Sequence, residues 1–255
     1  MHMNKKGQVT VFVILGIVII GVIGLLYYAI SKNYVKVPFV SSGTVSVQDH
    51  VEECITEKGN EAIVLIGQQG GDITPSLYQN WCVDSENCYK VSYLCYTSTP
   101  LQPCLNRRPF LKQHMEKEIK TYIDAHLQEC VDVDLWRDSG YSVSSGSYES
   151  KVFIDNDDTL ITVDWPLTVT KGEFTQTQDH FSHEFKVPLG RISDTAYEVV
   201  DSEIQSGDLM VVPYVVRNRG NIEVEKHRVG NTKVYILNTF KNDYKFYFAV
   251  AGYSL

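Results

Sequence analysis

The stretch RRPFLKQHMEKEIKTYIDAHLQECV, residues 107–131, has the most regular pattern in this chain of 255 residues. Apolar side chains recur every three or four positions, and Lys and Glu occupy the positions opposite them. This spacing predicts an amphipathic helix that packs one face against a core. Pro109 can occupy the first turn of that helix. The apolar stripe consists of Leu111, Met115, Ile119, Tyr122, Ile123 and Leu127.

A second amphipathic helix is predicted in VQDHVEECITEKGNEAIVLIGQQGG, residues 47–71, which ends in a Gly pair typical of helix termini. Cys54 lies on its apolar face, and Cys130 continues the apolar face of residues 107–131. A disulfide between Cys54 and Cys130 would therefore join the two helices. The apolar positions of this helix are Val51, Cys54, Ile55, Ala62, Leu65 and Ile66.

Between the two helices, residues 81–104 contain four cysteines in a Tyr-rich stretch with few aliphatic side chains. We expect this stretch to be rich in loops, and it cannot bury a core of its own, which favours disulfides. Zinc is the alternative, but the spacings include no short C-x-x-C pair. Four cysteines allow three connectivities, and the sequence does not choose among them. The four are Cys82, Cys88, Cys95 and Cys104.

From Trp136 onward the period of the apolar positions changes to two. Residues 141–171 alternate apolar and polar side chains on both sides of Asp155-Asn156-Asp157-Asp158, which predicts a hairpin. The acidic run superficially resembles a calcium loop, but Leu160 and Pro166 stand where an EF-hand needs Gly and a bidentate acid. We therefore interpret the run as a turn.

The last third of the chain combines one helix with further strands. Residues 188–207 predict a helix that ends at Gly207, and residues 222–255 predict strands with turns at Gly230-Asn231 and at 241–243. The fold class expected from all these patterns is α+β. A long hydrophobic N-terminal helix precedes a disulfide-stapled helical region, and a mostly antiparallel β ectodomain follows.

Residues 9–30 are apolar except for Thr10. A helix of this length spans about 33 Å, which is enough to cross a hydrocarbon core. An ordinary secretory signal has an apolar stretch of roughly 7–15 residues followed by small residues at a cleavage site. Here Leu25, Leu26, Tyr27 and Tyr28 occupy those positions, so we expect the segment to remain in the mature protein.

The start of this segment, Lys5-Lys6-Gly7-Gln8 followed at once by the apolar run, resembles a class III signal peptide. Such leaders belong to type IV pilins and archaeal pilin-like proteins. The resemblance covers about the first 30 residues. It implies that a membrane peptidase cuts between Gly7 and Gln8 and leaves the apolar helix at the new N-terminus. The fifth residue would then be Phe12, where many family members have a Glu that contacts the neighbouring subunit.

These patterns divide the chain into five parts. Residues 1–7 form the cleavable leader, and residues 8–30 form the transmembrane or filament-core helix. Residues 31–47 contain Pro, Gly and Ser and are predicted to be a linker. Residues 48–135 are the helical Cys-rich region, and residues 136–255 are the β-rich region with one helix.

The sequence gives little support to catalysis, cofactor binding or nucleic-acid binding. After Ile30 the chain has 21 basic and 31 acidic residues, a net charge of −10 without a basic stripe. It has neither a Gly-x-Ser-x-Gly elbow nor a phosphate-binding glycine loop. His180 and His183 would share a face on a helix and could bind a metal, but the surrounding sequence favours a strand or loop. We therefore expect a non-enzyme with no metal or cofactor.

The sequence predicts a protein of the cell surface or exterior, anchored in the membrane before assembly. The favoured form is a pilin-like subunit that polymerises with its own copies, because exposed apolar helices can be covered by lipid or by one another. Surface ligands or other cells are further candidate partners. The alternatives are a single-pass surface binding or adhesion protein that does not polymerise, and an extracytoplasmic enzyme. Self-assembly would use Val9, Phe12, Val13, Ile14, Leu15, Ile17, Ile19, Ile20, Ile23, Leu25 and Leu26.

Overall fold

The computed structural model describes residue 15 and residues 46–99, 102–217 and 222–252. The chain divides into two units, residues 1–45 and residues 46–255. The predicted leader, nearly all of the apolar segment and most of the predicted linker lie outside the described residues. The fold reported below is that of the second unit.

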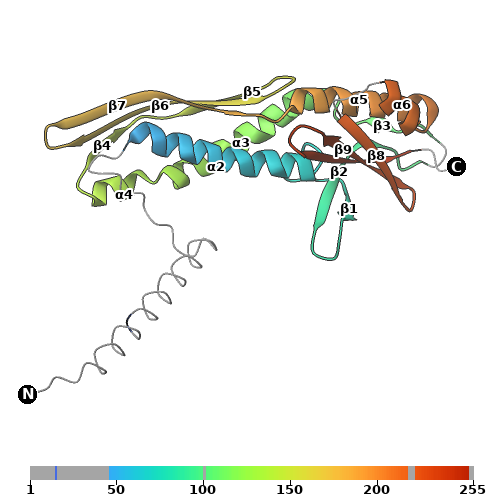
Figure 1. The fold of residues 1–255 in the computed structure, drawn as a ribbon, viewed down its shortest axis with the longest axis horizontal. Helices are drawn as coiled ribbons and strands as arrows, with labels where there is room; N and C mark the ends of the chain where they lie inside the picture. The colour runs from blue at the N-terminus through green and yellow to red at the C-terminus, as the bar shows by residue number, and fades with distance from the viewer. Residues whose placement is uncertain (1–14, 16–45, 100–101, 218–221, 253–255) are drawn as a thin grey trace, which may run out of the picture. The chain divides into compact units, whose positions relative to one another are not determined.

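Two long helices, α2 (Val47–Gln68) and α3 (Leu111–Val131), lie side by side along the length of this unit (Figure 1). They bury the stripes that the sequence predicts, except that Leu65 and Tyr122 are only half-buried. The side chain of Ser46 caps α2 by accepting a hydrogen bond from the Asp49 amide at 3.3 Å. One detail differs from the prediction. Pro109 precedes α3, because Phe110 is the N-cap residue.

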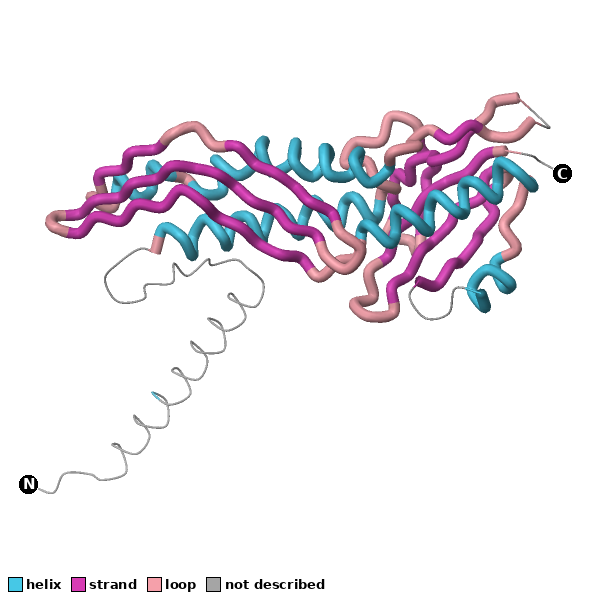
Figure 2. The backbone as a smooth tube through the Cα atoms, turned by 90° about the horizontal axis from the view of Figure 1, so that it is seen from above, coloured by secondary structure: helices cyan, strands magenta, loops and turns pink. Residues whose placement is uncertain are grey.

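One antiparallel sheet consists of β4 (Ser142–Ser145), β5 (Glu149–Ile154), β6 (Thr159–Lys171) and β7 (Phe174–Phe185). The long strand β6 pairs with β7 along one side and with β4 and β5 along the other. The turn at residues 155–158 joins β5 to β6, as predicted. Contacts of α2 with β7 and of α3 with β5 show that both helices pack against this sheet (Figure 2).

A second sheet has the strand order β1-β2-β10-β9-β8, with β3 paired to β2. The pairs are antiparallel except for β2 with β10, which is parallel. The Cys-rich stretch thus forms strands instead of the expected loops, because β2 finds its partner near the end of the chain. The strands are β1 (Tyr78–Cys82), β2 (Cys88–Tyr96), β3 (Leu105–Asn106), β8 (Ile222–Val229), β9 (Thr232–Thr239) and β10 (Lys245–Ala251).

Helix α5 (Leu189–Ser206) is the helix predicted before Gly207, and Gly207 is its C-cap with φ 72°. It packs against the second sheet and against α3. The short helices α4 (Val133–Asp138) and α6 (Val211–Arg217) are not anticipated by the sequence patterns. The buried side of α5 presents Leu189, Ile192, Ala196, Val199 and Val200.

Helix α2 connects the two sheets through close contacts at two glycines. A Cβ on Gly59 would meet the ring of Phe185 and the side chain of Ile161, both in the first sheet. A Cβ on Gly67 would lie 2.6 Å from the backbone oxygen of Lys245, in the second sheet. Only a residue without a side chain allows these approaches. The predicted helical and β-rich regions therefore fold together, with the sheets near opposite ends of the helix pair (Figure 1).

All six cysteines are paired in disulfides. The structure joins Cys54 to Cys130, the pair that the two apolar faces favour, with an S–S distance of 2.16 Å. The other bonds are Cys82–Cys88, across the ends of β1 and β2, and Cys95–Cys104. The described chain is therefore a mixed α+β protein with open, mostly antiparallel sheets and three disulfides. No helix within the described ranges has the length and apolar character needed to span a membrane.

Candidate functional site

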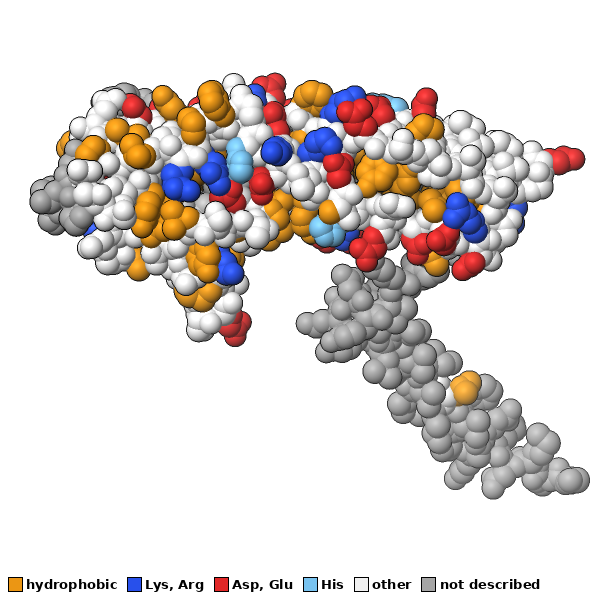
Figure 3. All heavy atoms as spheres, turned by 180° about the vertical axis from the view of Figure 1, so that it is seen from behind, with side chains coloured by type: hydrophobic (Ala, Val, Ile, Leu, Met, Phe, Trp, Pro, Cys, Tyr) orange, Lys and Arg blue, Asp and Glu red, His pale blue; other side chains and the backbone are white. Residues whose placement is uncertain are grey.

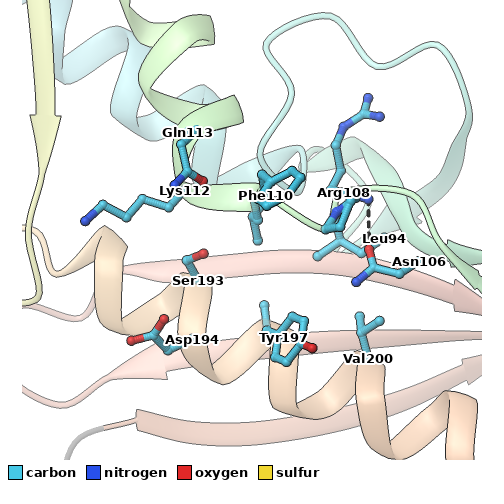
Figure 4. Close-up of a pocket in the computed structure, with 13 residues that line it drawn as sticks. Leu94, Asn106, Arg108, Phe110, Lys112, Gln113, Ser193, Asp194, Tyr197 and Val200 are labelled. Atoms are coloured by element: carbon cyan, nitrogen blue, oxygen red, sulfur yellow. Dashed lines mark hydrogen bonds between the residues drawn. The ribbon is translucent and has the colours of Figure 1, made fainter.

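The beginning of α3 and one side of α5 line a cavity of about 240 Å³ that is open to solvent (Figure 4). Residues 106–113 form one wall, and Ser193 to Val200 of α5 form the other. The turn before α3 is held in place by two hydrogen bonds. Arg107 N donates to Leu94 O at 2.8 Å, and Arg108 N donates to Asn106 Oδ1 at 2.9 Å. The cavity is therefore attached to the rigid edge of the second sheet.

The N-terminus of α3 has no cap. Phe110, at the N-cap position, makes no side-chain hydrogen bond, and the first turn contains no acidic residue. The amides of Leu111, Lys112 and Gln113 donate no hydrogen bond within the described part of the chain. Since the first amides of a helix have no partner inside the helix, this end offers donors and a partial positive charge.

Three polar side chains of the cavity, those of Ser193, Lys112 and Asp194, have no partner among the described residues. Ser193 is 7% exposed, and its hydroxyl has no hydrogen-bond partner among the described residues. In Figure 4 this hydroxyl points across the cavity toward the first turn of α3. Lys112 and Asp194 extend toward the same end of the cavity, and no ion pair joins them.

Apolar side chains supply the rest of the lining. Phe110 and Tyr197 approach the cavity from opposite walls (Figure 4) and are 73% and 55% exposed. Leu94, Ala196 and Val200 lie deeper, and all three are buried. The cavity thus combines hydrogen-bond donors at one wall with an aromatic and aliphatic lining, a mixture typical of ligand-binding sites.

A polar cluster around Asp72 lies behind the turn that forms the cavity wall. Oδ1 of Asp72 accepts hydrogen bonds from Arg108 Nη2 at 2.9 Å and from His114 Nε2 at 2.5 Å. Its Oδ2 accepts one from the Ser92 hydroxyl at 2.5 Å. Burial raises the pKa of Asp72, but the hydrogen bonds from His114, Ser92 and Arg108 outweigh it and lower the pKa to about 2. Asp72 is therefore a buried, ionised carboxylate.

This cluster contains the residues closest to a metal-binding set among those the structure describes. Donor atoms of Asp72, His114 and Glu118 lie within 4.8 Å of one another. However, the guanidinium of Arg108 shares an oxygen of Asp72 with His114, and a cation there would face that positive charge. Glu118 in turn accepts a hydrogen bond from the Ile73 amide at 2.8 Å. We assign the cluster a structural role, because its hydrogen bonds join the segment that follows α2 to β2 and to α3.

Neither feature was predicted from the sequence. The cavity walls are more than 80 residues apart in the chain, and the Asp72 cluster combines residues from three segments. The one local signal was Pro109 followed by a helix with no acidic residue in its first turn, which indicates an uncapped N-terminus.

The sites predicted at the N-terminus cannot be placed, since the junction of Gly7 and Gln8 lies outside the described residues, as do the self-assembly residues other than Leu15. Leu15 itself is helical and 55% exposed. The two histidines, His180 and His183, lie on β7, where a spacing of three places them on opposite faces of the sheet. The structure does not bring them together, and His180 instead contacts Asp164 at 2.8 Å.

The charges of the described surface are mixed. Figure 3 shows acidic and basic side chains interspersed on one face, with apolar side chains between them. No protein-family model, curated protein or solved structure matches this chain.

Proposed function

We propose that this chain is a cell-surface structural protein, the subunit of a pilin-like extracellular filament. The observation that carries the proposal is the Gly7-Gln8 junction placed directly before the apolar residues 9–30. This order matches a leader that is cut on the cytoplasmic side of a helix that stays in the protein. A conventional signal peptide would be cut after its apolar stretch.

The three disulfides support an extracytoplasmic location for the folded unit. Disulfides persist in oxidising compartments and are rare in the reducing cytosol. All six cysteines are paired, and the bond between Cys54 and Cys130 joins α2 to α3 across a sequence separation of 76. The apolar segment and the disulfide-bonded unit therefore belong to opposite environments, as expected for an anchored ectodomain.

In the proposed mechanism, the chain leaves the bilayer after its leader has been removed, and its apolar helix packs with the helices of neighbouring copies. Burial of the apolar surface drives this association. Outside the bilayer, the apolar helix can be shielded from water only by the apolar helices of other copies. A head-to-tail contact that does not close into a ring gives a helical filament. The unit formed by residues 46–252 would coat the outside of the filament, stiffened by its disulfides.

Electron microscopy of native cell-surface material tests this proposal. We expect fibres that contain the chain in cells producing the wild type, and none in cells producing Gly7→Leu, because the large side chain blocks the cut. The matched control is Asn4→Ala, a leader substitution away from the cut, which should leave the fibres intact. Fibres made by Gly7→Leu, or none made by the wild type, would refute the filament.

A second candidate function is a single-pass surface protein that binds a ligand and does not polymerise. The specific observation in its favour is the cavity between α3 and α5, because a purely structural subunit needs no such lining. This alternative predicts that the chain fractionates with membranes as isolated copies and that Met1 is retained.

A further inference from the structure

We infer that the cavity between α3 and α5 binds a carboxylate that carries an aromatic or other apolar group. The carboxylate would lie at the N-terminus of α3, and the apolar group between Phe110 and Tyr197. This site stands independently of the filament proposal, since it uses only residues of the folded unit.

The unused donors point to an anionic acceptor. Leu111, Lys112 and Gln113, whose amides have no partner in the described structure, line the same cavity as Ser193, whose hydroxyl is also without a partner. A helix N-terminus alone attracts many groups, but Ser193 is an independent observation on a different helix. The Ser193 residue is 7% exposed, and its unpartnered hydroxyl points into the cavity, where it can donate a hydrogen bond to a bound acceptor.

The charges of the lining favour a monoanion over a dianion. The guanidinium of Arg108 points away from the cavity in Figure 4 and is neutralised by Asp72. Lys112 is the other cation of the lining, and the carboxylate of Asp194 extends toward the same end. The helix N-terminus adds about half a positive charge. A carboxylate fits this balance, whereas a phosphate of charge near −2 would be repelled by Asp194.

The apolar walls of the cavity favour a ligand whose carboxylate is attached to a ring or another apolar group. Phe110 and Tyr197 leave most of their surface in water, and a ring placed between them would bury part of both. The volume of about 240 Å³ is far larger than the roughly 10–15 Å³ that a single water needs on the same measure, so the site has room for one ring and a short chain.

Binding of 3-phenylpropionate to the full chain, purified in detergent, tests the inference. The dissociation constant is measured by ligand-observed NMR, with the neutral 3-phenylpropionamide as the matched probe. We expect the acid to bind at least tenfold more tightly than the amide, since a hydrogen bond to a charged group is worth about a factor of ten. Equal affinity for the acid and the amide would overturn the inference. So would the absence of acid binding at about 10 mM, since a weaker interaction would not define a site.

Variants identify the site. Ser193→Ala and Lys112→Gln should each weaken binding of the acid about fivefold to tenfold, because each removes a donor to the carboxylate. The control is Lys117→Gln, which removes the same charge from an exposed position on α3 outside the cavity. Circular dichroism shows whether each variant is folded. If both Ser193→Ala and Lys112→Gln bind the acid as tightly as the wild type, the acid binds outside this cavity.

A peptide probe distinguishes two sources of the carboxylate. If acetyl-Glu-Phe-amide binds more tightly than 3-phenylpropionate, the natural ligand is an acidic segment of a protein. If it binds less tightly, the ligand is a small aromatic acid. These measurements use dispersed chains, so they give the same answer whether or not the protein forms filaments, and a failure here leaves the filament proposal standing.

Discussion

Arg108 Nη2 donates a hydrogen bond to Asp72 Oδ1 at 2.9 Å, although 36 residues separate the two in the chain. Asp72 directly follows the glycine pair that ends α2, and Arg108 lies in the turn that begins α3. The bond therefore fixes the end of one helix relative to the start of the other. It also holds one wall of the cavity, because the same turn positions Phe110 and Lys112.

Asp72→Asn should destabilise the protein by about 2 kcal/mol, because hydrogen bonds from Arg108 and His114 to an ionised, buried carboxylate are lost. Urea unfolding at neutral pH measures this loss. The control is Asp134→Asn, whose carboxylate is 74% exposed and should matter little. If the two substitutions have equal effects, Asp72 does not stabilise the fold as described.

The same carboxylate should give the stability a specific pH dependence. The pKa of Asp72 is lowered from 3.8 to about 2 in the folded chain, so the stabilisation is complete above pH 3.8. It is lost as the pH falls through about 2, because the unfolded chain binds the proton more tightly. The difference in unfolding free energy between wild type and Asp72→Asn should therefore shrink across this range. A difference that stays constant or grows as the pH falls contradicts the assignment.

Gly67→Ala tests the contact between α2 and β10. In an exposed helix this change would stabilise by about 1 kcal/mol. Here the new Cβ would lie 2.6 Å from Lys245 O and 2.7 Å from the hydroxyl of Tyr244. We expect the free energy of unfolding of Gly67→Ala to fall by about 2 kcal/mol, as it does when a side chain is forced into a filled core. Thermal or urea denaturation shows whether Gly67→Ala is less or more stable than the wild type. A more stable variant would rule out the close approach of α2 to β10.

The disulfides should differ in their contributions. Cys54–Cys130 closes a loop with a sequence separation of 76, and Cys82–Cys88 closes one of 6. Loop-closure entropy then predicts a loss of about 4 kcal/mol for Cys54→Ala with Cys130→Ala, and about 2 kcal/mol for the Cys82 and Cys88 pair. Both Cys82 and Cys88 are exposed, so mild reductant should open that bond first, detected by thiol labelling. Labelling of Cys54 before Cys82 and Cys88 would contradict this prediction.

Lys233→Met tests a buried ion pair under α5. Lys233 Nζ lies 2.8 Å from Glu203 Oε2, and the two side chains are 10% and 2% exposed. Burial and the charge of Glu203 raise the pKa of Tyr235, so its hydroxyl remains a donor to that carboxylate. Removing only Lys233 should cost about 3 kcal/mol, because it leaves a buried charge unpaired.

The double variant Glu203→Gln with Lys233→Met should recover part of that loss, since no charge then remains buried. Lys245→Met is the control, because Lys245 is exposed and belongs to no ion pair in the described structure. If the double variant is as unstable as the sum of its single changes, Glu203 and Lys233 do not act as a pair.

Local patterns in the sequence predicted those parts of the fold that local physics determines. The apolar stripes placed α2, α3 and α5, and the positions of Cys54 and Cys130 on the apolar faces of two of these helices favoured their bond. Turn residues located the hairpins at residues 155–158 and 230–231. Each stripe and each turn lies within about 25 residues of chain.

What the sequence did not predict depends on partners that are distant in the chain. The stretch containing Cys88 and Cys95 has too few aliphatic residues to suggest a central strand, yet β2 pairs with β10 about 150 residues later. The cavity likewise needs α5 against the start of α3, and no periodicity in either segment specifies that meeting. Such pairings follow from the packing of the whole unit.

The proposed filament requires that the apolar segment remain in the finished protein after the leader has been removed. Intact-mass spectrometry of the chain isolated from its native cells measures this directly, with peptide sequencing to locate the first residue. We predict a chain that begins at Gln8 and retains residues 9–30. A chain that begins at Met1, or one that begins beyond Ile30, would contradict the central claim.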